Sequence, residues 1–227
     1  MTIEQLRHDV NSRLPIPVTL AFADLPPETL GTLRPNNHGS FDISISAEFA
    51  QSENAMNIEA HEFAHIKLFL DGLIALGLHM LDTEAQEMLK RAINDAISHP
   101  FVVRIVEEYG LTNQPYYELC DSLVEDHYDE YIQPPTAVFV PRVVGVFLYG
   151  IWNANPNLRA SVEEILHQNS LTGVAFRIVQ SHLDGIDLRM ELQEQADRIT
   201  SMLREMGCEF DEEPEVVGST LRLLIRE

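Results

Sequence analysis

The chain has 227 residues, which is enough to bury a sizeable core in one large domain or two small ones. Its hydrophobic fraction of 45% is ordinary for a folded protein and argues against disorder. The formal net charge is −21, with 36 acidic residues against 15 basic ones. Because nucleic acids and anionic membranes attract basic surfaces, we expect neither as a partner.

Several features indicate a soluble cytoplasmic protein. The two cysteines, Cys120 and Cys208, lie far apart and match no Cys-x-x-Cys pattern, so we expect two reduced thiols. Residues 1–13 are mixed and polar, without the apolar core of a secretion signal. The longest apolar stretch, residues 136–152, is interrupted by a proline and an arginine and is too short for a membrane span.

The first 46 residues predict a short helix followed by a small, half-exposed sheet. Residues 3–14 have an amphipathic pattern that stops before Pro15 and Pro17. Strand-like runs follow over residues 18–23, 29–34 and 40–46. In Phe41-Asp42-Ile43-Ser44-Ile45-Ser46 apolar and polar residues alternate, as expected for a strand with one buried face.

From Ala47 onward the hydrophobic period becomes helical. A helix over 53–70 ends at Asp71-Gly72, and a second helix starts near residue 82 and runs to His99-Pro100, with a possible continuation to residue 110. Further helices are predicted over 116–132, 162–168, 174–183 and 188–206, with a buried apolar region over 137–151 and a strand-like tail over 215–226. The predicted fold class is therefore α+β and mainly helical, with a small N-terminal antiparallel or mixed sheet.

The first predicted long helix carries His61-Glu62-Phe63-Ala64-His65. Two histidines at i and i+4 point from one face of a helix, roughly 6 Å apart, so both imidazoles can reach one divalent metal, with Zn²⁺ the best candidate. Glu62 lies about 100° further around the helix axis. It is badly placed as a third ligand but well placed to take a proton from a metal-activated water.

The flanking residues support a metal site rather than two surface histidines. Apolar residues make this helix suitable for a domain interior, where unpaired polar groups are costly: Phe63, Ala64, Ile66, Leu68 and Phe69. A motif of this kind indicates a metal site when it lies on an apolar helix that follows a small sheet, and both features are predicted here. The competing interpretation is a pair of surface histidines that bind no metal.

Residues 57–65, Asn-Ile-Glu-Ala-His-Glu-Phe-Ala-His, resemble the active-site helix of the zincins, most closely that of compact intracellular ImmA/IrrE-type metallopeptidases. The resemblance extends over about residues 18–110. It implies that His61 and His65 bind zinc and that Glu62 is the catalytic base. It also implies that the strand before the helix, residues 41–46, aligns an extended peptide by edge pairing. We expect a single domain over 1–227, with a zincin-like core over about 15–110 and a helical C-terminal extension over about 111–227.

The resemblance leaves the third metal ligand open, and Glu84 is the first candidate. Residues 67–72 lack the glycine and third histidine with which metzincins continue. Zincins with a glutamate ligand carry it on a later helix, and Glu84 lies at a suitable distance along the chain. A helical hairpin turning through residues 72–77 would bring Glu84 or Glu87 to face the histidines. An acidic residue in the first turn of a helix is also favoured by the helix dipole alone.

His99 is the alternative third ligand. It lies on the same predicted helix, and some small bacterial zincin-like sequences carry an Asn…His pair there, here Asn94 and His99. A histidine at the end of a helix segment is also favoured without any metal. His79 and Asp95 are the remaining candidates, and Asn94 or Asp95 are candidate partners that would orient a ligand imidazole.

The function predicted from these residues is a zinc-dependent metallopeptidase acting on a peptide or protein substrate. The alternatives are a non-catalytic zincin-fold regulatory or binding protein with a structural metal, and a metal-free helical interaction protein. Tyrosines at positions 116, 117, 128 and 131 are candidate oxyanion donors, and no spacing selects one of them. The C-terminal helices are a possible surface for homo-oligomerisation.

Overall fold

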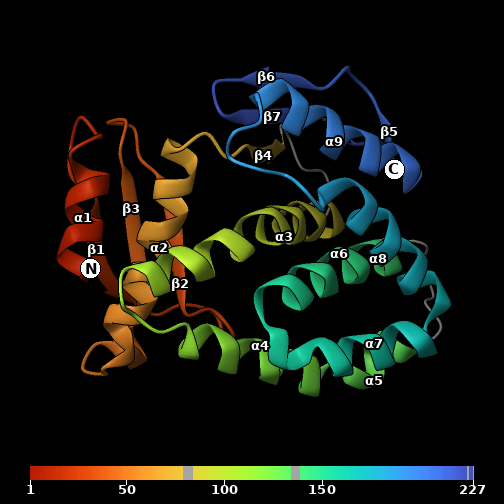
Figure 1. Ribbon diagram of the computed structural model, residues 1–227, viewed down its shortest axis with the longest axis horizontal. Coiled ribbons are helices and arrows are strands. Elements are labelled where there is room, and N and C mark those ends of the chain that lie inside the picture. The colour runs from red at the N-terminus through yellow and green to blue at the C-terminus, as the bar shows by residue number, and fades with distance from the viewer. Residues whose placement is uncertain (79–83, 134–138, 224, 227) are drawn as a thin grey trace. The chain divides into compact units, whose positions relative to one another are not determined.

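The computed structural model describes residues 1–78, 84–133, 139–223 and 225–226. The fold is mainly helical α+β, with a small mixed sheet near the N-terminus, which confirms the predicted fold class (Figure 1). The chain forms two compact units, the first made of residues 1–71 and 101–123 and the second of residues 72–100 and 124–227. The predicted boundary between core and extension, near residue 110, falls inside unit 1.

Unit 1 contains the predicted N-terminal helix, the small sheet and the motif helix. Its elements are α1 (Ile3–Asn11), β1 (Thr19–Ala23), β2 (Gly31–Pro35), β3 (Phe41–Ser46), the 3₁₀ helix η1 (Ala47–Phe49), α2 (Asn54–Leu70), the end of α3 (Glu84–Glu108) and most of α4 (Gln114–Asp126). The predicted helix over 116–132 is in fact two helices, because the chain breaks at His127 before α5 (Tyr128–Ile132).

Unit 2 contains most of the remaining helices and the C-terminal strands. Its elements are β4 (Ala75–Leu78), the first part of α3, α5, α6 (Phe139–Ala154), the 3₁₀ helix η2 (Pro156–Leu158), α7 (Arg159–Gln168), α8 (Ser170–Leu183), α9 (Leu192–Glu205), β5 (Glu209–Phe210), β6 (Glu215–Val217), β7 (Thr220–Leu223) and β8 (Ile225–Arg226). None of the helices in the described ranges is both long enough and apolar enough to cross a membrane.

The sheet of unit 1 has the order β1-β3-β2. β3 is parallel to β1, with Leu20 opposite Ile43, and antiparallel to β2, with Gly31 opposite Ile45. Ile43 and Ile45 are fully buried, which explains why this strongly alternating strand takes the central position. The prediction that residues 41–46 pair with a peptide is therefore wrong, because both edges of β3 are already occupied. Among the described residues, β1 and β2 form the two edges of this sheet.

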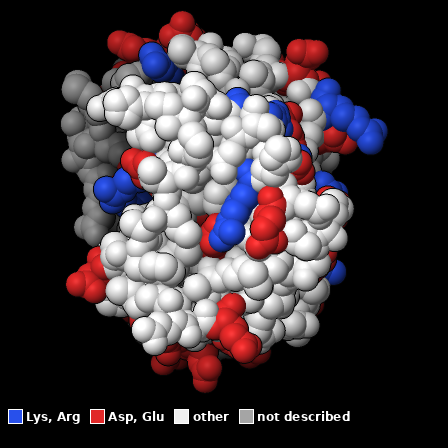
Figure 2. All heavy atoms as spheres, turned by 90° about the vertical axis from the view of Figure 1, so that its left-hand side faces the viewer, with Lys and Arg blue, Asp and Glu red and all other residues white. Residues whose placement is uncertain are grey.

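The outer strand β1 is exposed along most of its length. Leu20 and Phe22 are 40% and 45% exposed, although they lie opposite the buried Ile43 and Ile45 of β3. Figure 2 shows the side of the molecule on which α1 and β1 lie in Figure 1, and most of the surface there is uncharged.

Helix α1 packs on the motif helix α2 through apolar and charged contacts. Thr2 caps α1 in a capping box with Gln5, and the helix buries Ile3, Leu6 and Val10. Arg7 binds the buried Glu59 of α2 with two hydrogen bonds, Nε to Oε1 at 2.5 Å and Nη2 to Oε2 at 2.6 Å. The hydrogen bonds to Glu59 raise the pKa of the Arg7 guanidinium. This pair fixes α2 against α1 half a turn before His61.

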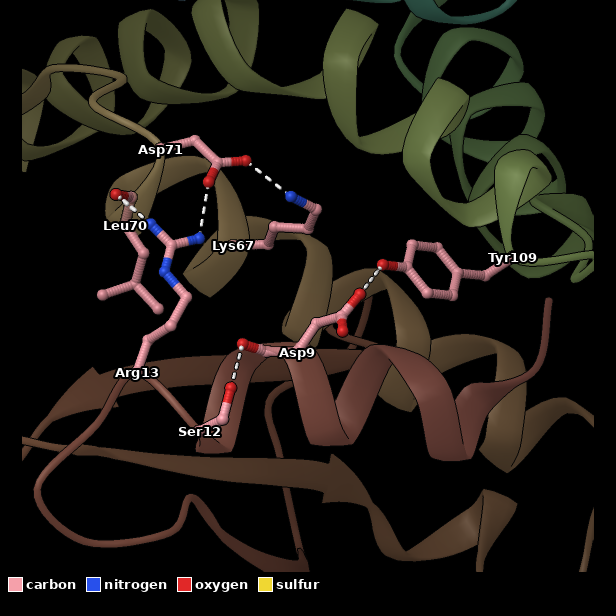
Figure 3. A network of polar contacts seen from close by, with 7 residues as sticks. All are labelled: Asp9, Ser12, Arg13, Lys67, Leu70, Asp71 and Tyr109. Atoms are coloured by element: carbon pink, nitrogen blue, oxygen red, sulfur yellow. Dashed lines mark hydrogen bonds and ion pairs between the residues drawn. The ribbon is translucent and has the colours of Figure 1, made fainter.

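A second polar network holds the C-terminal end of α2 (Figure 3). Asp71 accepts hydrogen bonds from Arg13 at 2.5 Å and from Lys67 at 2.6 Å, and Arg13 also donates to the carbonyl of Leu70. Burial raises the pKa of Asp71, but the hydrogen bonds and charges of Lys67 and Arg13 outweigh it, so the pKa lies below its usual value. Tyr109, from the end of α3, donates to Asp9 of α1.

Unit 2 is held by close helix packing and by neutral side chains that bind the backbone. Gly145 of α6 lies directly against α8, and the buried Gln195 of α9 binds the amide of Ile74 and the carbonyl of Gly72, both at 3.0 Å. β4 pairs in parallel with β7, with Ala75 opposite Thr220. A strand therefore occupies part of the connection between α2 and α3.

Candidate metal centre

Helix α2 presents His61 and His65 on one face, as their spacing predicts. Their Nε2 atoms lie 3.3 Å apart, and the ring centroids are 5.0 Å apart at an interplanar angle of 67°. Two nitrogen ligands on a tetrahedral zinc, with bonds of about 2.0–2.1 Å, are separated by about 3.3 Å. The two imidazoles are thus already at the separation that one zinc ion requires.

His99 completes a group of three histidines. One ligand atom from each of His61, His65 and His99 lies within 4.8 Å of the others, and the three form the metal-compatible group found among the described residues. His99 lies on α3 immediately before Pro100, and its side chain is only 12% exposed. Burial lowers the pKa of His99 to about 4, so the imidazole is neutral at pH 7, which is the form that binds a metal.

Glu84, the first candidate for the third ligand, begins α3, but its side chain lies outside the described residues. Its proposed role stays a prediction. Fifteen residues separate Glu84 from His99 on the same helix, which corresponds to roughly 22 Å along the axis. His79, another of the candidates, also lies outside the described residues.

The remaining candidates have other contacts. Glu87 forms ion pairs with Lys90 at 3.4 Å and with Arg91 at 3.1 Å. Asn94 binds both the amide and the carbonyl of Leu76, at 2.7 Å and 3.1 Å, so it holds β4 rather than an imidazole. The carboxylate of Asp95 lies 3.9 Å from Nε2 of His99, close enough to favour one orientation of that ring.

Glu62 lies on the same helix as the two motif histidines and is only 7% exposed. Its carboxylate is directed to the backbone of β2, the antiparallel edge strand of the sheet. A carboxylate buried beside a metal site has the low-dielectric surroundings in which proton transfer is effective. Unit 1 therefore contains the predicted base Glu62, the predicted ligands His61 and His65, and the edge strand β2.

Tyr116 of α4 is the tyrosine that the structure brings to this site. Its ring centroid lies 5.1 Å from that of His61, with the two rings tilted by 32°, and Tyr116 is only 8% exposed. Tyr128 binds Glu164, and the ring of Tyr131 contacts Phe147. Because Tyr116 is 55 residues from His61 in the chain, no local spacing could have singled it out.

No family model, curated protein or solved structure matches this chain. The case for a function therefore depends on the residues and their geometry.

Proposed function

We propose that the protein is a zinc-dependent metallopeptidase of the zincin type. The observation that supports this most strongly is the 3.3 Å separation of the His61 and His65 Nε2 atoms on α2, with His99 close by. Three histidine ligand atoms and a nearby buried carboxylate are typical of catalytic zinc sites, which keep a fourth position open. We also propose a cytoplasmic location, where the buried thiols of Cys120 and Cys208, which form no disulfide, would stay reduced.

In this proposal His99 is the third ligand in place of Glu84. The two residues are roughly 22 Å apart along one helix, so a single ion cannot be bound by both. This matters for the function, because four protein ligands would close the site and make the metal structural. With His61, His65 and His99 as ligands, the fourth position stays available to water.

A zinc ion held there would polarise a carbonyl oxygen and lower the pKa of a bound water to near 7. Glu62 acts as the base. Its carboxylate takes a proton from the attacking water as the new C–O bond forms, and then delivers that proton to the amine nitrogen as the C–N bond breaks. Burial of Glu62 keeps competing water away from the proton during this transfer.

The substrate is an extended peptide, and the strand that would align it is β2. β3 has no free edge, whereas β2 is an edge strand and lies against the carboxylate of Glu62. A peptide paired with β2 would have its backbone fixed by main-chain hydrogen bonds next to the base.

The test is hydrolysis of an unfolded protein or a mixed peptide library by the zinc-loaded protein, compared with two variants. We expect Glu62→Gln to retain zinc and to lose activity by about 100-fold or more, because it cannot accept the proton. Glu53→Gln, at the exposed start of the same helix, is the matched control and should keep full activity. Full activity in Glu62→Gln would rule out this mechanism. Bound zinc without any hydrolysis by the unaltered protein would favour the non-catalytic alternative.

A further inference from the structure

Gly31, the first residue of β2, lies directly against the carboxylate of Glu62. A Cβ atom added to Gly31 would be 2.7 Å from Oε1 of Glu62 and 3.2 Å from both Cδ and Cγ. Ordinary contacts of a Cβ atom begin near 3.4 Å. The three outer atoms of the Glu62 side chain therefore occupy the space in which the side chain of any other residue at position 31 would begin.

The backbone itself does not require glycine at this position. Gly31 is absent from the residues with positive φ, and its neighbours in β2 pair regularly with β3. Alanine is compatible with an extended strand and usually stabilises it relative to glycine. A side chain at position 31 is thus opposed by the carboxylate of Glu62 and not by the backbone conformation.

We propose that Gly31 is a positioning residue for Glu62. Its missing side chain lets the carboxylate lie against β2, and any larger residue pushes the carboxylate away from the strand by about 0.3–0.7 Å, so that the contact of 2.7 Å lengthens to between 3.0 and 3.4 Å. The contact involves the end of a flexible side chain, so the fold can accept the change while the carboxylate cannot keep its place. The catalytic consequence depends on the proposed role of Glu62 as the base.

The contact is tested first without any substrate, by a double-mutant cycle of unfolding midpoints. The variants are Gly31→Ala, Glu62→Ala and the double variant. We expect Gly31→Ala to lower the midpoint, or to raise it less, when Glu62 is present, and to raise it when Glu62 is absent. The two effects of Gly31→Ala should differ by about 2–4 °C. Equal effects in both backgrounds would overturn the proposal.

The positioning role is tested by activity and metal content together. We expect Gly31→Ala to lower kcat by about tenfold, because a displacement of several tenths of an ångström disturbs proton transfer, while bound zinc and KM change little. Gly77→Ala is the matched control, since its added Cβ would lie 2.6 Å from Cγ2 of Thr220 in β7 and so meets a similar crowding within unit 2. It should keep the full kcat.

The unfolding experiment and the activity experiment together distinguish the positioning role of Gly31 from the proposed peptidase function. If the protein hydrolyses peptides and Gly31→Ala is as active as the unaltered protein, the positioning role is wrong while the function stands. If no peptide is hydrolysed but the unfolding midpoints show the expected coupling, the contact stands and the peptidase function is wrong.

Discussion

Gly31 in unit 1 and Gly145 in unit 2 are equally crowded, but by different kinds of atoms. A Cβ atom on Gly31 would meet the carboxylate end of Glu62 at 2.7 Å. On Gly145 it would lie 2.6 Å from Cβ of Ala175, 2.9 Å from the amide nitrogen of Phe176 and 3.1 Å from the carbonyl of Thr172. A side-chain end can move, whereas the backbone of a packed helix cannot. The first glycine therefore makes room for a functional group and the second for close contact between α6 and α8.

The same difference extends to the two units. Unit 1 is held by charged groups that are partly or fully removed from water, such as Arg7 with Glu59 and Arg13 with Asp71. Unit 2 relies on helix packing and on neutral side chains that bind the backbone, such as Gln195 and Asn94. We therefore expect loss of charge to damage unit 1 and added volume to damage unit 2.

We expect Arg7→Ala to cause the largest loss of stability among the variants compared here. The change leaves the carboxylate of Glu59, whose side chain is 6% exposed, buried without its guanidinium partner. Because Arg7 itself is 40% exposed and water can replace part of it, we expect a loss of about 2–3 kcal/mol in the free energy of unfolding. Glu4→Ala removes an exposed partner of Arg7 at 4.0 Å and is the control, with a much smaller loss expected because water screens this pair. Equal losses in both variants, measured by chemical denaturation, would contradict this prediction.

Gly145→Ala should destabilise unit 2 by adding volume without changing charge. Because backbone atoms of α8 lie in the way, we expect a loss of about 2 kcal/mol in the free energy of unfolding. Gly150→Ala provides a graded comparison, since its nearest contact is Cα of Ala96 at 3.1 Å and its loss should be smaller. Zinc content should be unchanged in both. A Gly145→Ala protein as stable as the unaltered one would show that α6 and α8 can separate freely.

Asp71→Asn should give a stability loss that depends on pH. The pKa of Asp71 is lowered in the folded state from its usual 3.8, so its stabilisation is fully present above that value and disappears as the pH falls through the lower folded pKa. We expect a loss of about 1 kcal/mol at pH 7, limited by solvent screening of this partly exposed group. Denaturation of both proteins from pH 7 to pH 2 should show the difference vanish. The loss in Gly145→Ala should not follow this profile.

Tyr116→Leu should have the smallest effect, a change in zinc affinity. Loss of the aromatic contact with His61 leaves that imidazole less well oriented, and we expect zinc to bind about threefold more weakly. Tyr116→Phe keeps the ring and should bind zinc as the unaltered protein does, as measured by competition with a chelator. Weaker zinc binding in Tyr116→Phe would show that the hydroxyl, rather than the ring, supports the site.

The parts of the site that the sequence predicted are those determined within one helix. His61, Glu62 and His65 lie within five residues, and the period of α2 alone determines which faces they occupy. The placement of Tyr116 beside His61 depends on a contact between segments far apart in the chain. The central position of β3 could not be predicted either, because a chain running from β1 through β2 to β3 is equally consistent with β2 in the middle.

The role of Gly31 illustrates the same limit in another way. In the sequence, Gly31 is one glycine within a predicted strand, and nothing around it indicates a role. Its proposed role depends on the contact with Glu62, which only the structure shows. The sequence likewise predicted the α+β class from the change of hydrophobic period near Ala47, yet it did not predict strand β4. Short strands that pair with partners far along the chain, as β4 does with β7, leave little local signal.

Metal content is the most direct test of the account as a whole. Purified protein should be dialysed against zinc, freed of excess metal and analysed for zinc per chain, alongside variants in which His61, His65, His99 or Glu84 is replaced by alanine. We predict one zinc per chain in the unaltered protein and in Glu84→Ala, and a loss of bound zinc in each of the three histidine variants. Zinc retained in His99→Ala and lost in Glu84→Ala would contradict the three-histidine site.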